Sequence, residues 1–206
     1  MTKRRRVPAM APEARRAVLI AATVPLLRAH GTALSTRQIA EAAGVAEGTI
    51  FGVFPDKASL LRAALMSAFD PEPGVEALKA IDPSLDLRER LCRAVTLLRE
   101  GMSANARLMA APRELMTEDA EFHQRMFDTR NRIAAGLAAL MEPDRDRLRR
   151  APEAAAHLLL MLIAVRVHHG LTIGDFGDMD DEETVSVLLD GLLVRPLPTP
   201  PTESAP

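Results

Sequence analysis

The sequence predicts an all-α protein, and three observations support this class. Apolar residues make up 48% of the 206 residues, which is enough for a substantial core. Along most of the chain these residues recur at the three- and four-residue spacing of an amphipathic helix. Proline and glycine separate the apolar segments, as expected where one helix ends and another begins. The single cysteine, Cys92, excludes an internal disulfide and a cysteine-based zinc site.

The charges are divided unevenly along the chain. Residues 1–62 contain ten Lys or Arg against four Asp or Glu, whereas residues 63–206 contain sixteen against twenty-four. A basic amino-terminal part on an acidic body is typical of a protein that presents one end to a polyanion. Chance clustering is the alternative explanation.

The first elements expected are a basic arm over residues 1–10 and a helix from Pro12 to His30, ended by Gly31. Proline is favoured in the first turn of a helix, and glycine just after the last turn. The inner row of this helix is expected to be Val18, Ala22 and Leu26. The arm would lie on a phosphate backbone or in a narrow minor groove, or it is a solvated terminus without function. Its basic residues include Arg4, Arg5 and Arg6.

Residues 35–57 predict a helix-turn-helix. Ser35 would cap the first helix, and Gly44 would end it because glycine accepts a left-handed turn without steric cost. Ile50 and Phe54 are four residues apart and would pack the second helix inward. That second helix, about Ala46–Phe54, would enter a DNA major groove. Its outward side would hold Glu47, Gly48, Thr49, Phe51, Gly52 and Val53.

The stretch IAEAAGVAEGTIFGVFPDKASLL resembles the amino-terminal domain of the TetR/AcrR transcriptional regulators, over about residues 12–70. The resemblance implies a three-helix DNA-binding head over residues 11–56 and a connecting helix over residues 57–70. It also implies a helical ligand-binding and dimerisation domain over residues 75–195, and the proline-rich tail, residues 196–206, should be disordered. The positions that match the family are Ile39, Ala40, Ala43, Gly44, Val45, Gly48, Thr49, Ile50, Phe54 and Lys57.

Three positions depart from the family's pattern. The family usually has a hydroxyl-bearing residue at Ala46, and ring or hydroxyl-bearing residues at Phe51 and Val53. These positions normally hydrogen-bond phosphates or bases, and neither Phe51 nor Val53 can donate such a bond. We expect the docking mode to be kept with fewer phosphate contacts. A helix-turn-helix that no longer binds DNA is the alternative.

The resemblance assigns DNA contacts to the arm, the helix-turn-helix and the start of the connecting helix. Thr49 and Lys57 would bind phosphate, and Thr36 and Arg37 would approach the backbone or a base edge. Glu47 would accept a hydrogen bond from a cytosine amino group. The expected DNA-binding residues are Arg4, Arg5, Arg6, Thr36, Arg37, Ala46, Glu47, Gly48, Thr49, Phe51, Gly52, Val53 and Lys57.

The rest of the chain predicts only helices. Asp70–Gly74, with two prolines, should end the connecting helix. Beyond it we expect a helix around Leu87–Met102, a shorter segment over about Ser103–Met116, a long helix opening at Thr117 and another over about Pro152–His169. A last helix should follow an acidic start. The expected buried rows are Leu60, Leu61, Ala64, Leu65 and Phe69; Leu87, Leu91, Val95, Leu98 and Met102; Phe122, Met126, Ile133, Leu137 and Leu140; and Val185, Leu188, Leu189, Leu192 and Leu193.

The last two helices resemble the pair through which the family dimerises. The middle of the helix that opens at Pro152 is apolar almost all round, which indicates packing against a second subunit as well as its own core. Completion of a monomer core is the alternative. The expected interface residues are Leu158, Met161, Leu162, Val165, Val185, Leu188, Leu189 and Leu192.

The resemblance also implies a pocket for an unknown small-molecule inducer. Methionine adapts to irregular cavities, and with few aromatic residues the pocket would suit a lipophilic or amphipathic molecule. Ordinary core filling is the alternative for each methionine. The expected lining is Met102, Asn105, Met109, Arg113, His123, Met126, Met161 and His168.

These patterns favour a homodimeric repressor that a small molecule releases from a palindromic operator in double-stranded DNA. No nucleophile elbow, H-E-x-x-H or phosphate-cradling glycine loop occurs, so we expect no catalytic residue, cofactor or metal. No secretory leader follows the basic start, and the longest apolar run is too short for a bilayer, so we expect a cytoplasmic protein without a membrane partner. A ligand-independent dimeric DNA-binding regulator and a small all-helical enzyme remain alternatives.

Overall fold

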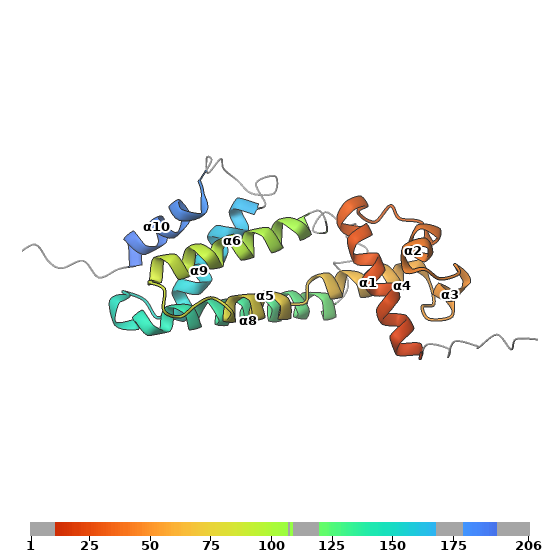
Figure 1. Ribbon diagram of the computed structural model, residues 1–206, viewed down its shortest axis with the longest axis horizontal. Coiled ribbons are helices and arrows are strands. Elements are labelled where there is room, and N and C mark those ends of the chain that lie inside the picture. The colour runs from red at the N-terminus through yellow and green to blue at the C-terminus, as the bar shows by residue number, and fades with distance from the viewer. Residues whose placement is uncertain (1–10, 107, 109–119, 168–178, 193–206) are drawn as a thin grey trace, which may run out of the picture. The chain divides into compact units, whose positions relative to one another are not determined.

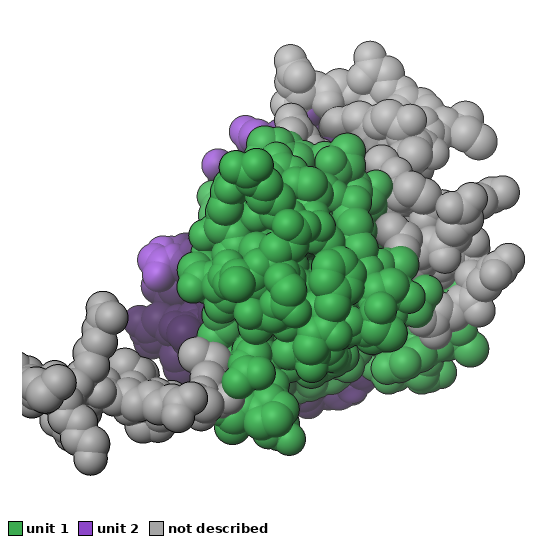
Figure 2. Space-filling model, turned by 90° about the vertical axis from the view of Figure 1, so that its right-hand side faces the viewer, with its two compact units in different colours: residues 1–73, 100–132 green, residues 74–99, 133–206 purple. Residues whose placement is uncertain are grey.

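The computed structural model describes residues 11–106, 108, 120–167 and 179–192 (Figure 1). The elements that these residues form are all helices, which confirms the predicted all-α class. None of them is both long and apolar enough to cross a membrane. The chain folds as two compact units, coloured separately in Figure 2. Unit 1 contains residues 1–73 and 100–132, and unit 2 contains residues 74–99 and 133–206.

The amino-terminal helices of unit 1 lie close to where the sequence places them. They are α1 (Pro12–His30), α2 (Thr36–Ala43), α3 (Gly48–Phe51) and α4 (Lys57–Ala68), and α1 packs against both α2 and α4. The expected inner row of α1 is wrong by one residue, because its buried residues are Leu19, Thr23 and Leu27. The buried Thr23 hydroxyl donates to the Leu19 carbonyl at 2.7 Å, so a polar residue is tolerated on the inner face.

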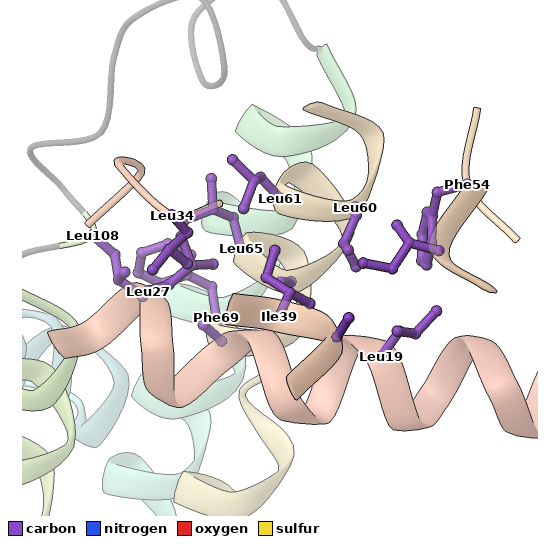
Figure 3. Packing of buried hydrophobic residues seen from close by; sticks show 14 of the residues in the cluster. Leu19, Leu27, Leu34, Ile39, Phe54, Leu60, Leu61, Leu65, Phe69 and Leu108 are labelled. Carbon is purple, nitrogen blue, oxygen red and sulfur yellow. The ribbon is translucent and has the colours of Figure 1, made fainter. Parts of the chain in front are cut away.

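One apolar cluster holds unit 1 together (Figure 3). Side chains from α1, α2 and α4 point into the space between these helices, and Phe54 lies at one end of the cluster. Leu108 and Phe122, which the sequence assigns to the body, join the same cluster. The rings of Phe69 and Phe122 meet edge to face at 5.9 Å. The compact unit therefore extends beyond the expected head and includes residues 100–132.

The break at Asp70–Gly74 ends α4 but does not separate two helical regions. Helix α5 (Glu72–Lys79), which the sequence did not predict, begins inside it. Asp70 Oδ1 accepts from the Glu72 amide at 3.1 Å, and a proline in the first turn removes only an amide that has no partner there. Gly74 allows close packing, since an added Cβ would lie 2.9 Å from Ile133 Cδ1.

The remaining helices are α6 (Leu87–Asn105), α8 (Ala120–Met141), the 3₁₀ helix η2 (Glu142–Arg147), α9 (Pro152–Val167) and α10 (Asp181–Leu192). Helix α9 packs against α10 within unit 2. The rows expected on α6 and α8 face inward, except that Met102, Met126 and Leu140 are only half-buried. The expected segment Ser103–Met116 and the end of α9 near His169 lie largely outside the described residues.

Unit 2 contains two charged clusters, one buried and one half-buried. The buried Arg90 guanidinium pairs with Asp144 and donates to the Leu85 carbonyl at 2.8 Å. Asp181, at the start of α10, accepts from Arg99 of α6 and Arg166 of α9, each at 2.9 Å. Helices α6 and α9 are thereby both hydrogen-bonded to the first turn of α10.

Candidate nucleic-acid interface

Local hydrogen bonds define the first helix of the helix-turn-helix. The Ser35 hydroxyl accepts from the Gln38 amide at 3.2 Å, and Gln38 Oε1 accepts from the Ser35 amide at 2.8 Å. This reciprocal pair is a capping box. Gly44 has φ 65°, and the Val45 amide donates to the Ala40 carbonyl at 3.0 Å. The start and the left-handed end predicted for this helix are confirmed.

The second helix is shorter than predicted. Only Gly48–Phe51 form the α3 helix, instead of about Ala46–Phe54. Tight turns extend it at both ends: the Thr49 amide donates to the Ala46 carbonyl at 2.8 Å, and the Val53 amide to the Ile50 carbonyl at 3.0 Å. The α3 helix is therefore flanked on both sides by tight turns whose backbone hydrogen bonds span three residues, as in a 3₁₀ helix. Ile50 and Phe54 are 0% and 1% exposed, so the predicted inward face is confirmed.

The outward face of this stretch carries few large side chains. Ala46, Glu47, Gly48 and Gly52 are exposed, Thr49 is half-buried, and Phe51 is 54% exposed. Val53 was expected on this face but packs against the apolar cluster of unit 1, because the tight turn after α3 rotates it inward. We call Ala46, Glu47, Gly48, Thr49, Phe51 and Gly52 the recognition surface.

A shallow hollow adjoins the recognition surface. It is lined by Ala46, Gly48, Thr49 and Gly52, together with Val45 and Arg15 of α1. Arg15 was not among the predicted DNA-binding residues, and the signal that could have indicated it is the pair of arginines, Arg15 and Arg16, near the start of α1. Arg16 instead lies over the Phe54 ring at 4.4 Å, which fixes α1 against the end of the recognition stretch.

Carboxylates of the protein hold two of the predicted DNA-contacting side chains. The Thr36 hydroxyl donates to Glu47, which links the start of α2 to the start of α3. Arg37 Nε donates to Glu41 at 2.9 Å, and this hydrogen bond and the charge of Glu41 raise the pKa of Arg37. Both members of the Arg37–Glu41 pair are strongly exposed. Exposed pairs contribute little stability, so a phosphate can replace Glu41 at low cost.

The start of α4 supplies the last predicted DNA contact. Asp56 Oδ1 accepts from the Ser59 amide at 2.7 Å, which confirms the predicted cap, and this bond lowers the pKa of Asp56. Lys57 follows as the first residue of α4 and is half-buried. The basic arm with Arg4, Arg5 and Arg6 lies outside the described residues.

The expected inducer-binding residues that the structure describes belong mostly to one unit. Met102, Asn105, His123 and Met126 belong to unit 1, and Met161 belongs to unit 2, where it is 62% exposed. Asn105 has a structural role: its Oδ1 accepts from Arg28 Nε, and its Nδ2 donates to the Ala68 carbonyl, both at 2.9 Å. Met109, Arg113 and His168 lie outside the described residues.

The expected interface residues have two different environments. On α10, Val185, Leu188 and Leu189 are buried within unit 2, so they fill its own core. On α9, Leu162 and Val165 are half-buried, while Leu158 and Met161 are largely exposed. Val187 of α10, which the sequence analysis did not single out, is 50% exposed. The side chain of Leu192 lies outside the description.

Residues 19–64 match the sequence profile of the tetR family of bacterial regulatory proteins, which confirms the resemblance seen in the sequence. The fold is similar to that of a TetR-family transcriptional regulator from Mesorhizobium loti MAFF303099 (TM-score 0.70, 15% identity, covering 90% of this chain and 100% of that one). It is also similar to a TetR-family regulator from Streptomyces coelicolor (TM-score 0.63, 19% identity, 88% and 80% covered). A transcriptional regulator from Rhodococcus sp. Rha1 has a TM-score of 0.59 and 22% identity, with 91% and 100% covered. No curated protein sequence matches the chain.

Proposed function

Because this chain carries the amino-terminal DNA-binding domain of the tetR family of bacterial regulatory proteins, we propose that it is a homodimeric repressor released from its operator by a small lipophilic or amphipathic molecule. The observation that carries the proposal is the helix-turn-helix itself. Its first helix is capped at Ser35, its turn is set by Gly44, and its second helix buries Ile50 and Phe54. The recognition surface is thereby left outward, as docking in a major groove requires.

The proposed contacts combine phosphate binding with a close approach of the backbone. Thr49, Lys57 and Arg37 supply groups that bind phosphate oxygens, and Arg15 lines the hollow together with Thr49. The basic arm with Arg4, Arg5 and Arg6 adds charge that attracts DNA. Gly48 and Gly52 place no side chain between the helix backbone and the groove.

Exposed apolar side chains support the proposed dimer. Leu158 and Met161 on α9 and Val187 on α10 face solvent in a single chain, and α9 packs against α10. In a dimer with a two-fold axis, these side chains of one copy would pack against the same side chains of the other, so both copies would bury the same patch. Two recognition surfaces related by that axis would then bind a near-palindromic operator, with half-sites about one helical turn apart.

The hydrogen bonds of Asn105 support a route for the proposed release. Asn105 lies at the end of α6 and bonds both Arg28 of α1 and the Ala68 carbonyl of α4. A ligand that shifts α6 would therefore pull on both helices that carry the head. Such coupling is typically about 1 to 3 kcal/mol and must be reciprocal.

The DNA contact is tested by selecting duplexes from a randomised pool with the full chain. The Arg37→Ala, Thr49→Ala double variant should bind the selected duplex at least about tenfold more weakly, since two phosphate contacts are lost. Arg93→Ala, which removes an exposed charge on α6, is the matched control and should bind normally. Affinity should also fall steeply with added salt. Enrichment of no duplex over random competitor would refute the proposal.

The dimer is tested by the Met161→Glu, Val187→Glu double variant in sedimentation velocity. Both side chains are exposed, so the fold should survive while the protein becomes monomeric and loses specific binding. Phe127→Glu is the control. It replaces an exposed aromatic ring of α8 by a charged side chain, and this variant should remain dimeric. If the double variant still sediments as a dimer, the interface lies elsewhere.

The release is tested with 8-anilinonaphthalene-1-sulfonate, an amphipathic fluorescent probe. Saturating amounts of the selected duplex should weaken binding of the probe by the same factor by which the probe weakens binding of the duplex. Independent binding of the two would favour a regulator that needs no ligand.

A further inference from the structure

The recognition surface offers few groups that can read bases by hydrogen bonds. Gly48 and Gly52 have no side chain, and Ala46 has only a methyl group. Glu47 Oε1 accepts a hydrogen bond from Thr36, which occupies part of its carboxylate. Thr49 is half-buried. The largest group presented outward by this surface is the apolar ring of Phe51.

The exposure of Phe51 is not required by the fold. Ile50 and Phe54, its neighbours along the stretch, already fill the apolar cluster of unit 1 and are fully buried. Phe51 is 54% exposed on the opposite side. A large apolar ring in this position has no partner in the apolar cluster to which Ile50 and Phe54 belong.

The two glycines on this surface are also not required by the fold. A Cβ added at Gly48 would meet nothing within 4 Å, and one added at Gly52 would only touch the Thr49 carbonyl oxygen at an ordinary 3.5 Å. Among the described glycines, only Gly31 and Gly44 have a positive φ. Gly48 and Gly52 therefore leave the backbone uncovered on the surface that also carries the ring of Phe51.

The chemistry of the major groove identifies the target of such a ring. Base edges there present hydrogen-bond donors and acceptors, and the one apolar group is the 5-methyl group of thymine. A phenyl ring can neither donate nor accept a conventional hydrogen bond. We propose that Phe51 is a specificity-determining residue that reads a thymine 5-methyl group in each half-site. This inference rests on the proposed function, because it needs a DNA-bound recognition surface.

The test replaces thymine by deoxyuridine in the selected duplex, one position at a time. This exchange removes the methyl group and leaves the base-pairing edge unchanged. The wild-type chain should lose about fourfold in affinity at one thymine of each half-site, as expected for one buried methyl group. Phe51→Ala should lose that sensitivity, binding the thymine and deoxyuridine duplexes equally. Phe51→Leu keeps an apolar side chain and should keep a preference for thymine.

A control separates the ring from a general weakening of binding. Thr49→Ala removes a phosphate contact and should weaken both duplexes by the same factor, leaving the preference for thymine intact. Circular dichroism should show unchanged helix content in the Phe51 variants, because the ring is on the surface.

The outcomes distinguish the two proposals. If specific binding persists but deoxyuridine has no effect at any position, Phe51 does not read a methyl group, and the proposed function stands. If Phe51→Ala weakens both duplexes equally and keeps the preference for thymine, the ring contacts the sugar-phosphate backbone, and the inference is overturned. If no duplex is selected at all, the proposed function fails, and the inference fails with it.

Discussion

The head and unit 2 are both helical, yet different interactions hold their interiors. The cluster between α1, α2 and α4 is apolar, and its one buried hydroxyl, on Thr23, is satisfied within its own helix. The interior of unit 2 instead includes Arg90 with Asp144, and Asp181 with two arginines. Salt and pH act on charges far more than on apolar contacts. A salt effect on DNA binding therefore reports the DNA contacts rather than unfolding of the head.

The largest effect on stability is expected in the head, from Phe54→Ala. Removing this buried ring should destabilise the head by about 4 kcal/mol, because a cavity remains where Phe54 filled the cluster. Hydrogen exchange should accelerate in peptides from α2 and α3. Phe51→Ala removes an equal ring from the surface and should change the stability by less than about 0.5 kcal/mol. Equal effects of the two variants would contradict the assigned faces of α3.

The next largest effect is expected in unit 2, from Asp144→Ala. It leaves the Arg90 guanidinium buried without its counter-charge, at a cost of about 3 kcal/mol measured by urea unfolding. Arg147→Ala removes only the exposed partner of Asp144 and should cost less than about 1 kcal/mol. Combining Arg90→Met with Asp144→Leu should recover most of the loss. Failure of that rescue would mean that the charges themselves stabilise unit 2.

The pH dependence of unit 2 should depend on Asp181. Burial alone would raise the pKa of Asp181, but hydrogen bonds from Arg99, Thr96 and Arg166 outweigh it and hold the pKa below its ordinary value. A carboxyl with a lowered pKa stabilises the fold above its unfolded pKa of about 4, and this stability is lost as the pH falls further. Asp181→Asn should therefore cost about 2 kcal/mol at neutral pH and progressively less in acid.

The measurement is the unfolding free energy of the wild type and the variant between pH 7 and pH 3. Glu89→Gln, at an exposed carboxylate paired with Arg93, is the control and should change little at any pH. A constant difference between Asp181→Asn and the wild type across this range would exclude titration of Asp181 as the cause.

The smallest changes in stability are expected from substitutions at two glycines of the helix-turn-helix. Gly44→Ala should destabilise the head by about 1 kcal/mol, because φ is 65° there. Gly48→Ala meets open space at an ordinary backbone conformation, so it should stabilise the head by up to about 1 kcal/mol while weakening DNA binding. If urea unfolding showed that both substitutions lower the unfolding free energy, both glycines would be required by the fold.

Capping and turn signals could be predicted from the sequence, whereas the buried face of α1 and the helix α5 could not. The caps at Ser35 and Asp56 and the turn at Gly44 follow from neighbouring residues, and all three are present. The inner face of α1 was misplaced because the partner of the Thr23 hydroxyl is a backbone carbonyl, which a count of apolar residues does not register. Helix α5 was missed because its prolines resemble a loop signal.

In the candidate site, too, some positions could be predicted from the sequence and others could not. The outward position of Phe51 and the inward positions of Ile50 and Phe54 follow from helical spacing. Arg15 was missed because its place beside α3 depends on how α1 crosses the helix-turn-helix. On α10, helical spacing identified an apolar row but could not tell whether its own unit or a second copy covers it.

The two bonds of Asn105 have a further consequence. An amide side chain does not titrate, and neither does its partner on α4, which is a backbone carbonyl. The bond from α6 to α4 is therefore indifferent to acidity, unlike the carboxylate anchor at the start of α10. Acidification should loosen the hold of α10 on α6 before it affects the bond between α6 and α4.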